Sequence, residues 1–156
     1  IIQQQLKAVG IKMNIRIIEW STFIKNFVDK KNFDALILGW NITPDPDQFS
    51  IWHSSQKKDG QYNFVSYDNA EVDRILEQGR REFDPETRKR LYRRMHRIIH
   101  DDLPYIFLYY PDNLPVVHER FEGVRIAPVS TFGFGWNFDK WFVREKNVRY
   151  PVRAKD

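Results

Sequence analysis

A strand–helix–strand pattern near the start of the chain is the feature that most restricts its fold. Apolar and polar residues alternate over residues 11–17, which is the period of a strand with one buried face. Residues 35–38 are apolar without interruption, as in a central parallel strand buried on both faces. Between them Ser21 is a suitable N-cap for a short helix. Two parallel strands joined through a helix form a right-handed βαβ unit, so we expect an α/β fold.

Two longer helices are expected in the second half of the chain. The first is capped by Asp68 or Asn69, and its apolar residues recur at helical spacing. Asp84 followed by Pro85 gives an N-cap and a first-turn proline, so a second helix begins there and ends at Pro104. The predicted inner residues are Val72, Ile75, Leu76, Gly79 and Phe83 in the first helix, and Leu91, Tyr92, Met95, Ile98 and Ile99 in the second.

The remaining segments complete an irregular framework. A helix is already under way at the first residues, without a capping residue before it, and Gly10 ends it, so we expect a chain cut from a longer protein. Residues 105–110 are expected to form a third strand. Residues 41–68 have neither period but are rich in aromatic residues, which is typical of a binding loop rather than of disorder.

Composition excludes several classes of protein. The 156 residues can build one domain with a proper core, and 42% hydrophobic residues exclude a disordered chain. The longest uncharged apolar run, residues 35–40, is too short to span a bilayer. Without cysteine there is no disulfide, thiolate metal site or cysteine nucleophile.

No catalytic residue, metal site or cofactor is expected. His96 and His100 have the spacing of a shared metal site on a helix, but Arg97 stands where a zinc-protease helix needs glutamate. Asp45 and Asp47 are too close in sequence to be assigned the opposed geometry of a glycosidase. Motifs of serine hydrolases, P-loops and dinucleotide sites are absent from the sequence.

The net charge of +4 leaves a nucleic-acid partner open. The alternative function is therefore a basic nucleic-acid-binding module that uses the Arg88–Arg97 helix face. The basic residues are dispersed among 21 acidic ones, and no docking element or stacking platform is legible, so a solvated helix face is the simpler interpretation. No nucleic-acid partner is expected.

Candidate ligand-binding residues follow from the expected strand order. Ligands of open α/β sheets lie beyond the carboxyl ends of the strands, and all three expected strands end in aromatic residues. The second strand runs directly into the long loop. The same rings could instead cap the core. The candidates are Trp20, Trp40, Asn41, Thr43, Asp45 and Trp52.

Seven segments in order carry a family resemblance. They are IIQQQLKAVGIKMNIRIIEW (1–20), FDALILGW (33–40), PDPDQFSIWHSSQ (44–56), YDNAEVD (67–73), the helix from Asp84 to Tyr92, LPYIFLYYP (103–111) and FEGV (121–124). Over residues 1 to 142 the chain resembles family 5 extracellular solute-binding proteins, the oligopeptide-, dipeptide- and nickel-binding receptors of ABC importers.

The resemblance implies a longer parent of two α/β lobes that enclose a ligand between them. The implied fold class is α/β, a partial periplasmic-binding-protein-like lobe with a βαβ sheet flanked by helices and an irregular C-terminal tail. Residues 1–111 would be the α/β core of the second lobe, and residues 112–156 a crossover and tail returning toward the first. The chain would then be the C-terminal part of the receptor.

The same resemblance implies a function, partners and a location for the parent. The parent would be the substrate-binding component of an ABC importer, not an enzyme, and would capture a peptide, an oligosaccharide or a chelate. It would act with the importer membrane subunits as a monomer, in the periplasm or outside the cell, with a lipid anchor an open alternative.

One departure bears on the ligand. Peptide-binding members of the family place an aspartate shortly after the Gly-Trp-like pair, where it pairs with the free amine of the peptide. Here Gly39-Trp40 is followed by no acid until Asp45. Either Asp45 substitutes, or the ligand has no amine that needs a counter-charge. A third interpretation is that the Asp-Pro-Asp turn organises the loop through hydrogen bonds to the backbone.

Overall fold

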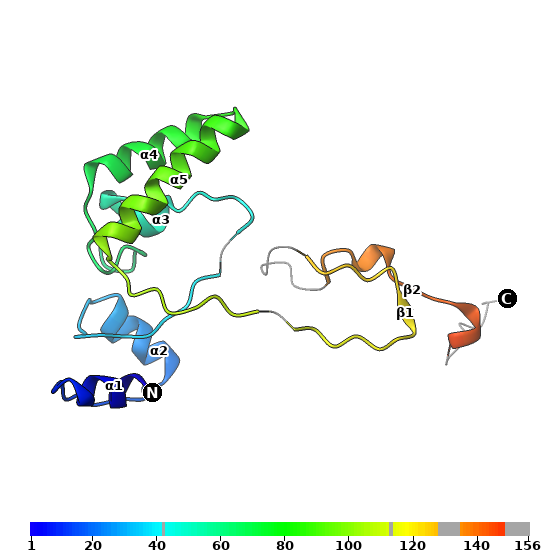
Figure 1. Cartoon of the computed structure of the whole chain (residues 1–156), viewed down its shortest axis with the longest axis horizontal. Coiled ribbons are helices and arrows are strands. Elements are labelled where there is room, and N and C mark those ends of the chain that lie inside the picture. Colours follow the sequence, from blue (N-terminus) through cyan, green and yellow to red (C-terminus); the bar gives the residue numbers. More distant parts are fainter. Residues whose placement is uncertain (42, 113, 128–134, 149–156) are drawn as a thin grey trace. The chain divides into compact units, whose positions relative to one another are not determined.

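The computed structural model describes residues 1–41, 43–112, 114–127 and 135–148 (Figure 1). The chain divides into two compact units. Unit 1 comprises Ile1–Ile37 and Asp47–Pro104, and unit 2 comprises Leu38–Pro46 and Tyr105–Asp156. Residues 105–111 therefore belong with the tail segment in this chain. The lobe boundary predicted after residue 111 concerns the longer parent and stays a prediction.

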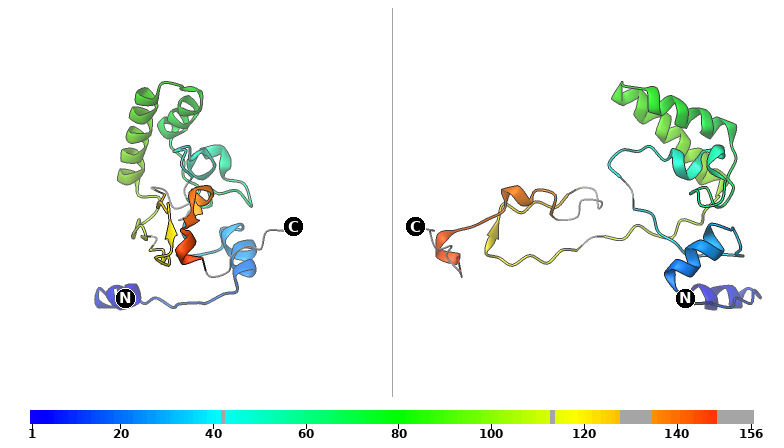
Figure 2. Two further views of the ribbon diagram at one scale, coloured as in Figure 1. Left: turned by 90° about the vertical axis from the view of Figure 1, so that its right-hand side faces the viewer. Right: turned by 180° about the vertical axis from the view of Figure 1, so that it is seen from behind.

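The centre of unit 1 is a hairpin of two helices, α4 (Ala70–Arg81) and α5 (Pro85–Asp102), which lie side by side in both views of Figure 2. Both predicted starts are confirmed. The Asn69 side chain accepts from two backbone N–H groups of α4, and Asp84 accepts from Thr87 N–H at the start of α5. The residues buried between the helices are Val72, Ile75, Leu76, Gly79, Tyr92, Met95 and Ile99.

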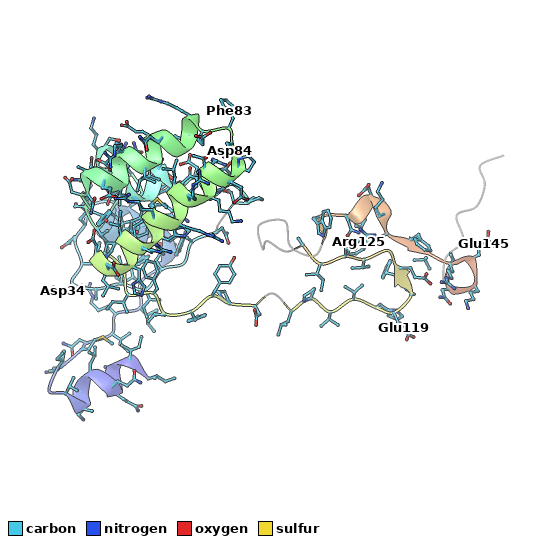
Figure 3. The ribbon with its side chains drawn as sticks, turned by 45° about the horizontal axis from the view of Figure 1, so that its top comes forward. Asp34, Phe83, Asp84, Glu119, Arg125 and Glu145 are labelled. Atoms are coloured by element: carbon cyan, nitrogen blue, oxygen red, sulfur yellow. The ribbon has the colours of Figure 1, made fainter. Side chains whose placement is uncertain are left out.

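Phe83 was expected in the inner stripe of the first helix, and this prediction is wrong. α4 ends at Arg81, so Phe83 lies in the turn before α5 and its side chain is 95% exposed. Figure 3 shows it at the end of the hairpin beside Asp84. The helical period does not continue through the turn, because the Asp84-Pro85 pair begins a new helix first.

The segment before α4 is ordered by two short turns and one buried amide. α3 (Phe49–Trp52) and a 3-10 turn (Ser54–Gln56) precede an irregular run to Tyr67. Asn63 is fully buried in this run. Its Nδ2 donates to the carbonyl oxygens of His53 (3.1 Å) and Tyr67 (2.9 Å), and its Oδ1 accepts from Tyr67 N–H (2.8 Å). The hydrogen bonds of the Asn63 side chain thus hold this irregular run together.

The first helices of unit 1 are short. α1 (Ile2–Ala8) buries no residue, and Gly10, which follows its C-cap Val9, has the expected left-handed conformation with a φ of +85°. α2 (Trp20–Phe23) continues as a π-helical turn over Ile24–Val28. Ser21 is not its N-cap. Glu19 caps it instead, because its carboxylate accepts from the N–H groups of Ser21 (2.8 Å) and Thr22 (2.9 Å).

The expected βαβ sheet is absent from the described residues, which is a correction to the fold prediction. Residues 11–17, 35–38 and 105–110 carry no strand ladder. An apolar pattern indicates only which side chains favour burial, whereas a strand also needs a neighbouring backbone about 4.8 Å away. Apolar side chains of these segments stay exposed, including Ile15 (63%), Ile17 (98%), Ile37 (71%) and Ile106 (85%).

The one sheet in the described residues lies in unit 2. β1 (Phe121–Glu122) pairs antiparallel with β2 (Phe142–Val143), in the register Phe121 with Val143. Short 3-10 turns occupy Phe138–Lys140 and Glu145–Asn147. Asn137 is 5% exposed, donates to Gly123 O (2.6 Å) and accepts from the Trp141 indole (2.9 Å). The described part of the tail is therefore locally ordered.

Candidate functional site

The sequence-predicted site residues fall into both units. Trp40, Asn41, Thr43 and Asp45 lie in one segment of unit 2, and Trp20 and Trp52 lie in unit 1.

Trp40 is the anchored residue of the unit 2 segment. It is half-buried, and its side chain is hydrogen-bonded to that of Tyr105. Burial raises the pKa of the Tyr105 phenol to about 12, while the hydrogen bond from Trp40 opposes this increase. An indole can only donate, so the phenol oxygen is the acceptor. The contact fixes the orientation of the Trp40 ring.

The residues after Trp40 present polar groups to solvent. Asn41, Thr43 and Asp45 are all exposed. Thr43 Oγ1 donates to the backbone oxygen of Asp45 (3.0 Å), which tightens the turn. Asn41 and Asp45 supply an amide and a carboxylate that can recognise a polar solute.

Asp47 has the loop-organising role considered for the Asp-Pro-Asp turn. Its Oδ1 accepts from Phe49 N–H (3.0 Å) at the start of α3. Its Oδ2 accepts from Arg80 Nε (2.8 Å), and the Arg80 guanidinium lies 3.9 Å from the centre of the Phe49 ring. Asp47 therefore ties the loop to α4.

Trp20 and Trp52 differ in accessibility. Trp20 begins α2 and is 65% exposed, with its ring centre 6.0 Å from that of Phe23. Trp52 is 4% exposed, donates from its indole to Gln48 Oε1 (2.8 Å) and packs edge-on against Tyr67. The Trp52 ring is thus part of the core of unit 1, whereas Trp20 presents an aromatic face to solvent.

A buried cluster around His53 was not anticipated from the sequence. The His53 ring is stacked on Phe49 at 4.0 Å, and its Nδ1 accepts from Ser55 N–H (3.1 Å). This bond leaves the proton on Nε2, which lies 3.5 Å from Glu77 Oε1. Ser54 N–H donates to Asp73 Oδ1 (2.8 Å) beside it. No single motif signals this cluster, because its members come from segments about twenty residues apart.

The His53 cluster has a structural role. Ser55 Oγ lies 2.8 Å from His53 Nδ1, so a serine, a histidine and an acid are adjacent. The Nδ1 atom is engaged by the Ser55 backbone, however, and the side chain acts as the N-cap of the 3-10 turn. Its role is to fasten Ser54–Gln56 to α4. In the described part of the chain, no group of three histidine, aspartate or glutamate side chains is arranged to hold a metal ion.

The histidine pair of α5 and its basic face lie at the surface. His96 and His100 are exposed, and His100 Nδ1 is 3.2 Å from Asp101 Oδ1. Arg94 forms an ion pair with Glu71 across the hairpin, and Lys89 lies 3.4 Å from Glu86.

Among the described residues, no helix has both the length and the apolar composition that a membrane span requires.

Comparison with known proteins gives consistent relatives. The family model described as "Bacterial extracellular solute-binding proteins, family 5 Middle" matches residues 1–62. The chain is 35% identical over 144 residues to the oligopeptide-binding protein AppA of Bacillus subtilis. This alignment covers 92% of the chain and 26% of AppA. It is 28% identical to the probable di/tripeptide-binding protein 5 of Pseudomonas aeruginosa, over 86% of this chain and 26% of that protein.

The fold is similar to a solved structure as well. The structure of AppA in complex with a nonapeptide matches with a TM-score of 0.70 at 35% identity, over 91% of this chain and 28% of that one. The predicted partial periplasmic-binding-protein-like lobe is thereby confirmed, although its βαβ sheet is not formed in the described residues. The chain spans about a quarter of the length of these relatives. The family model, the relatives and the solved structure all make the chain similar to family 5 of the bacterial extracellular solute-binding proteins, whose members are binding proteins rather than enzymes.

Proposed function

We propose that the longer protein containing this chain is the substrate-binding component of an ABC importer. It captures a peptide between two lobes, and this chain supplies part of one of them. The observation that carries the proposal is the similarity, over 91% of the chain, to a structure that holds a nonapeptide. The names of the relatives also favour solute capture over the nucleic-acid alternative.

Trp40 is the proposed aromatic wall of the solute site. Its ring is held by Tyr105 and is only half-buried, so one part of the indole is fixed and another is accessible. A pre-oriented ring loses little conformational entropy when a solute packs on it. Asn41 and Thr43 follow it with exposed polar groups, and Trp20 is a second accessible ring.

Asp45 is the proposed counter-charge for the free amine of a peptide. It is the first acid after Trp40, and it is exposed. The hydroxyl groups of an oligosaccharide can donate to a carboxylate or to an amide oxygen, whereas the cationic amine of a peptide is attracted to the charge of the carboxylate. Asp45→Asn keeps an acceptor and removes the charge, so it should weaken the binding of a peptide more than that of an oligosaccharide.

The setting of the proposed receptor follows from the family. It works outside the cytoplasmic membrane, either free or lipid-anchored, and delivers its solute to the membrane subunits of the importer. It acts as a monomer and uses no cofactor, because capture and release need only a hinge motion and differential contacts in the closed state.

Mass spectrometry of the longer protein under native conditions tests this proposal. We expect a co-purified peptide on the wild type and on the Asp59→Asn control, whose carboxylate forms an exposed ion pair with Lys30. Asp45→Asn should lose most of that peptide. If Asp45→Asn and the control retain equal amounts of peptide, Asp45 is not part of the site. If the co-purified molecule is an oligosaccharide or a chelate, the proposed solute is wrong.

A further inference from the structure

The outer face of α5 carries an uninterrupted stripe of basic residues that the solute site does not use. Lys89, Arg90, Arg93 and Arg97 are exposed, and no acidic residue occurs between Thr87 and His100. The buried side of the same helix is formed by Tyr92, Met95 and Ile99, so the stripe faces away from the core. From Arg90 to Arg97 it extends about 10 Å along the helix.

Two of these arginines have no partner among the described residues. Lys89 is near Glu86, and Arg90 donates to Thr87 Oγ1 (2.8 Å). Arg94, on the flank of the helix, is paired with Glu71. Within the described part of the chain, by contrast, nothing accepts a hydrogen bond or ion pair from Arg93 or Arg97. Their guanidinium groups are available for an external anion.

We propose that the stripe of Lys89, Arg90, Arg93 and Arg97 binds the surface of an anionic phospholipid membrane. A guanidinium group matches phosphate, as it does carboxylate, with two hydrogen bonds, and a lipid surface presents phosphates without requiring a complementary shape. A stable protein interface typically buries about 800 Å² per partner and has an apolar centre. The stripe contains charged side chains only, which favours a lipid surface over a folded partner.

An exposed aromatic ring in the turn before α5 supports the choice of a membrane. Phe83 lies in the turn before α5 and is 95% exposed (Figure 3). Surface-bound helices typically combine basic residues with exposed aromatic or aliphatic ones that enter the headgroup region. The acids near this end are Glu82, Asp84 and Glu86. Asp84 caps α5, and Glu86 lies near Lys89. These acids therefore weaken the attraction to an anionic membrane near the turn more than along Arg93 and Arg97.

Vesicle flotation with the full chain tests the proposal. The chain should float with vesicles of phosphatidylglycerol mixed with phosphatidylcholine, but not with phosphatidylcholine alone, and added salt should release it. Each basic residue near an anionic surface contributes roughly fivefold to binding, so Arg93→Gln/Arg97→Gln should weaken it about 30-fold. Arg93→Lys/Arg97→Lys keeps both charges but loses the paired hydrogen bonds of the guanidinium groups, so its binding should lie between that of the Gln variant and that of the wild type.

The matched control is Arg74→Gln/Arg81→Gln, which removes two exposed arginines from α4. Four outcomes would overturn the proposal: absence of flotation by the wild type, equal flotation of the Gln variant, an equal loss in the α4 control, or tighter binding to duplex DNA than to anionic vesicles. The vesicles hold neither peptide nor importer. A failure here therefore leaves the proposed solute capture untouched, and a failure of solute capture leaves this binding untouched.

Discussion

Replacing Asn63 by alanine should unfold the segment between α3 and α4. Asn63 is 0% exposed, and its amide makes three well-formed hydrogen bonds to the backbone of His53 and Tyr67. These bonds hold together a run that has no strand or long helix of its own. Trp52 and Phe64, both buried, depend on the same run for their positions.

The magnitude follows from the groups left behind. A hydrogen bond contributes about 1 kcal/mol net, whereas a buried backbone group left without a partner costs about 1–3 kcal/mol. Asn63→Ala strands the Tyr67 N–H and two carbonyl oxygens, so the free energy of unfolding should fall by about 3–5 kcal/mol. Asn63→Asp keeps the shape but turns an acceptor toward both carbonyls, and should be at least as damaging at neutral pH.

Urea unfolding followed by far-UV circular dichroism measures both changes. Protonation of the new carboxyl restores a donor, and its pKa in the folded state is raised by burial beside two carbonyls. The deficit of Asn63→Asp relative to wild type should therefore shrink as the pH falls from neutral into the acid range. A loss below about 1 kcal/mol for Asn63→Ala, or a deficit of Asn63→Asp that does not depend on pH, would refute the reasoning.

Two further predictions concern the hairpin and the solute segment. Gly79→Ala should destabilise by up to about 2 kcal/mol, because the new Cβ would meet the buried Tyr92 ring at 2.8 Å and overpacking outweighs the helix preference of alanine. In a double-mutant cycle with Tyr92→Leu the two losses should be less than additive, and a stabilising Gly79→Ala would contradict the contact. Spectrophotometric titration should find the Tyr105 phenol ionising near pH 12, and Trp40→Phe should raise its pKa further by removing a donor. Because this pKa is raised above its unfolded value, the associated stability is complete below about pH 10 and is lost between about pH 10 and 12. A Tyr105 that titrates near 10 would show that the phenol is not buried, and an unchanged Tyr105 pKa in Trp40→Phe would show that the pair is not formed.

The helical hairpin could be predicted from the sequence because its signals are local. Asn69 and Asp84 cap helices by bonding to residues two or three positions ahead, and the helical period identifies most of the buried side. Phe83 is the exception, since the period alone does not show where the turn begins.

The strands and the buried clusters could not be predicted in the same way. Alternation over residues 11–17 correctly marks apolar side chains, but pairing depends on a neighbouring backbone that no local pattern specifies. Asn63 and His53 look like ordinary loop residues, and their burial comes from contacts ten or more positions away. Of the candidate site, Trp40 and its exposed neighbours are proposed from their position after an expected strand, whereas the burial of Trp52 depends on packing against Tyr67, which their positions in the sequence do not show.

Calorimetric titration of the longer protein with nonapeptides tests the central proposal most directly. The account predicts saturable one-to-one binding that weakens when Trp40 is replaced by alanine and is unchanged by replacing the exposed Tyr62. Saturable binding of an oligosaccharide with no binding of any peptide, or peptide binding that is indifferent to Trp40, would contradict it.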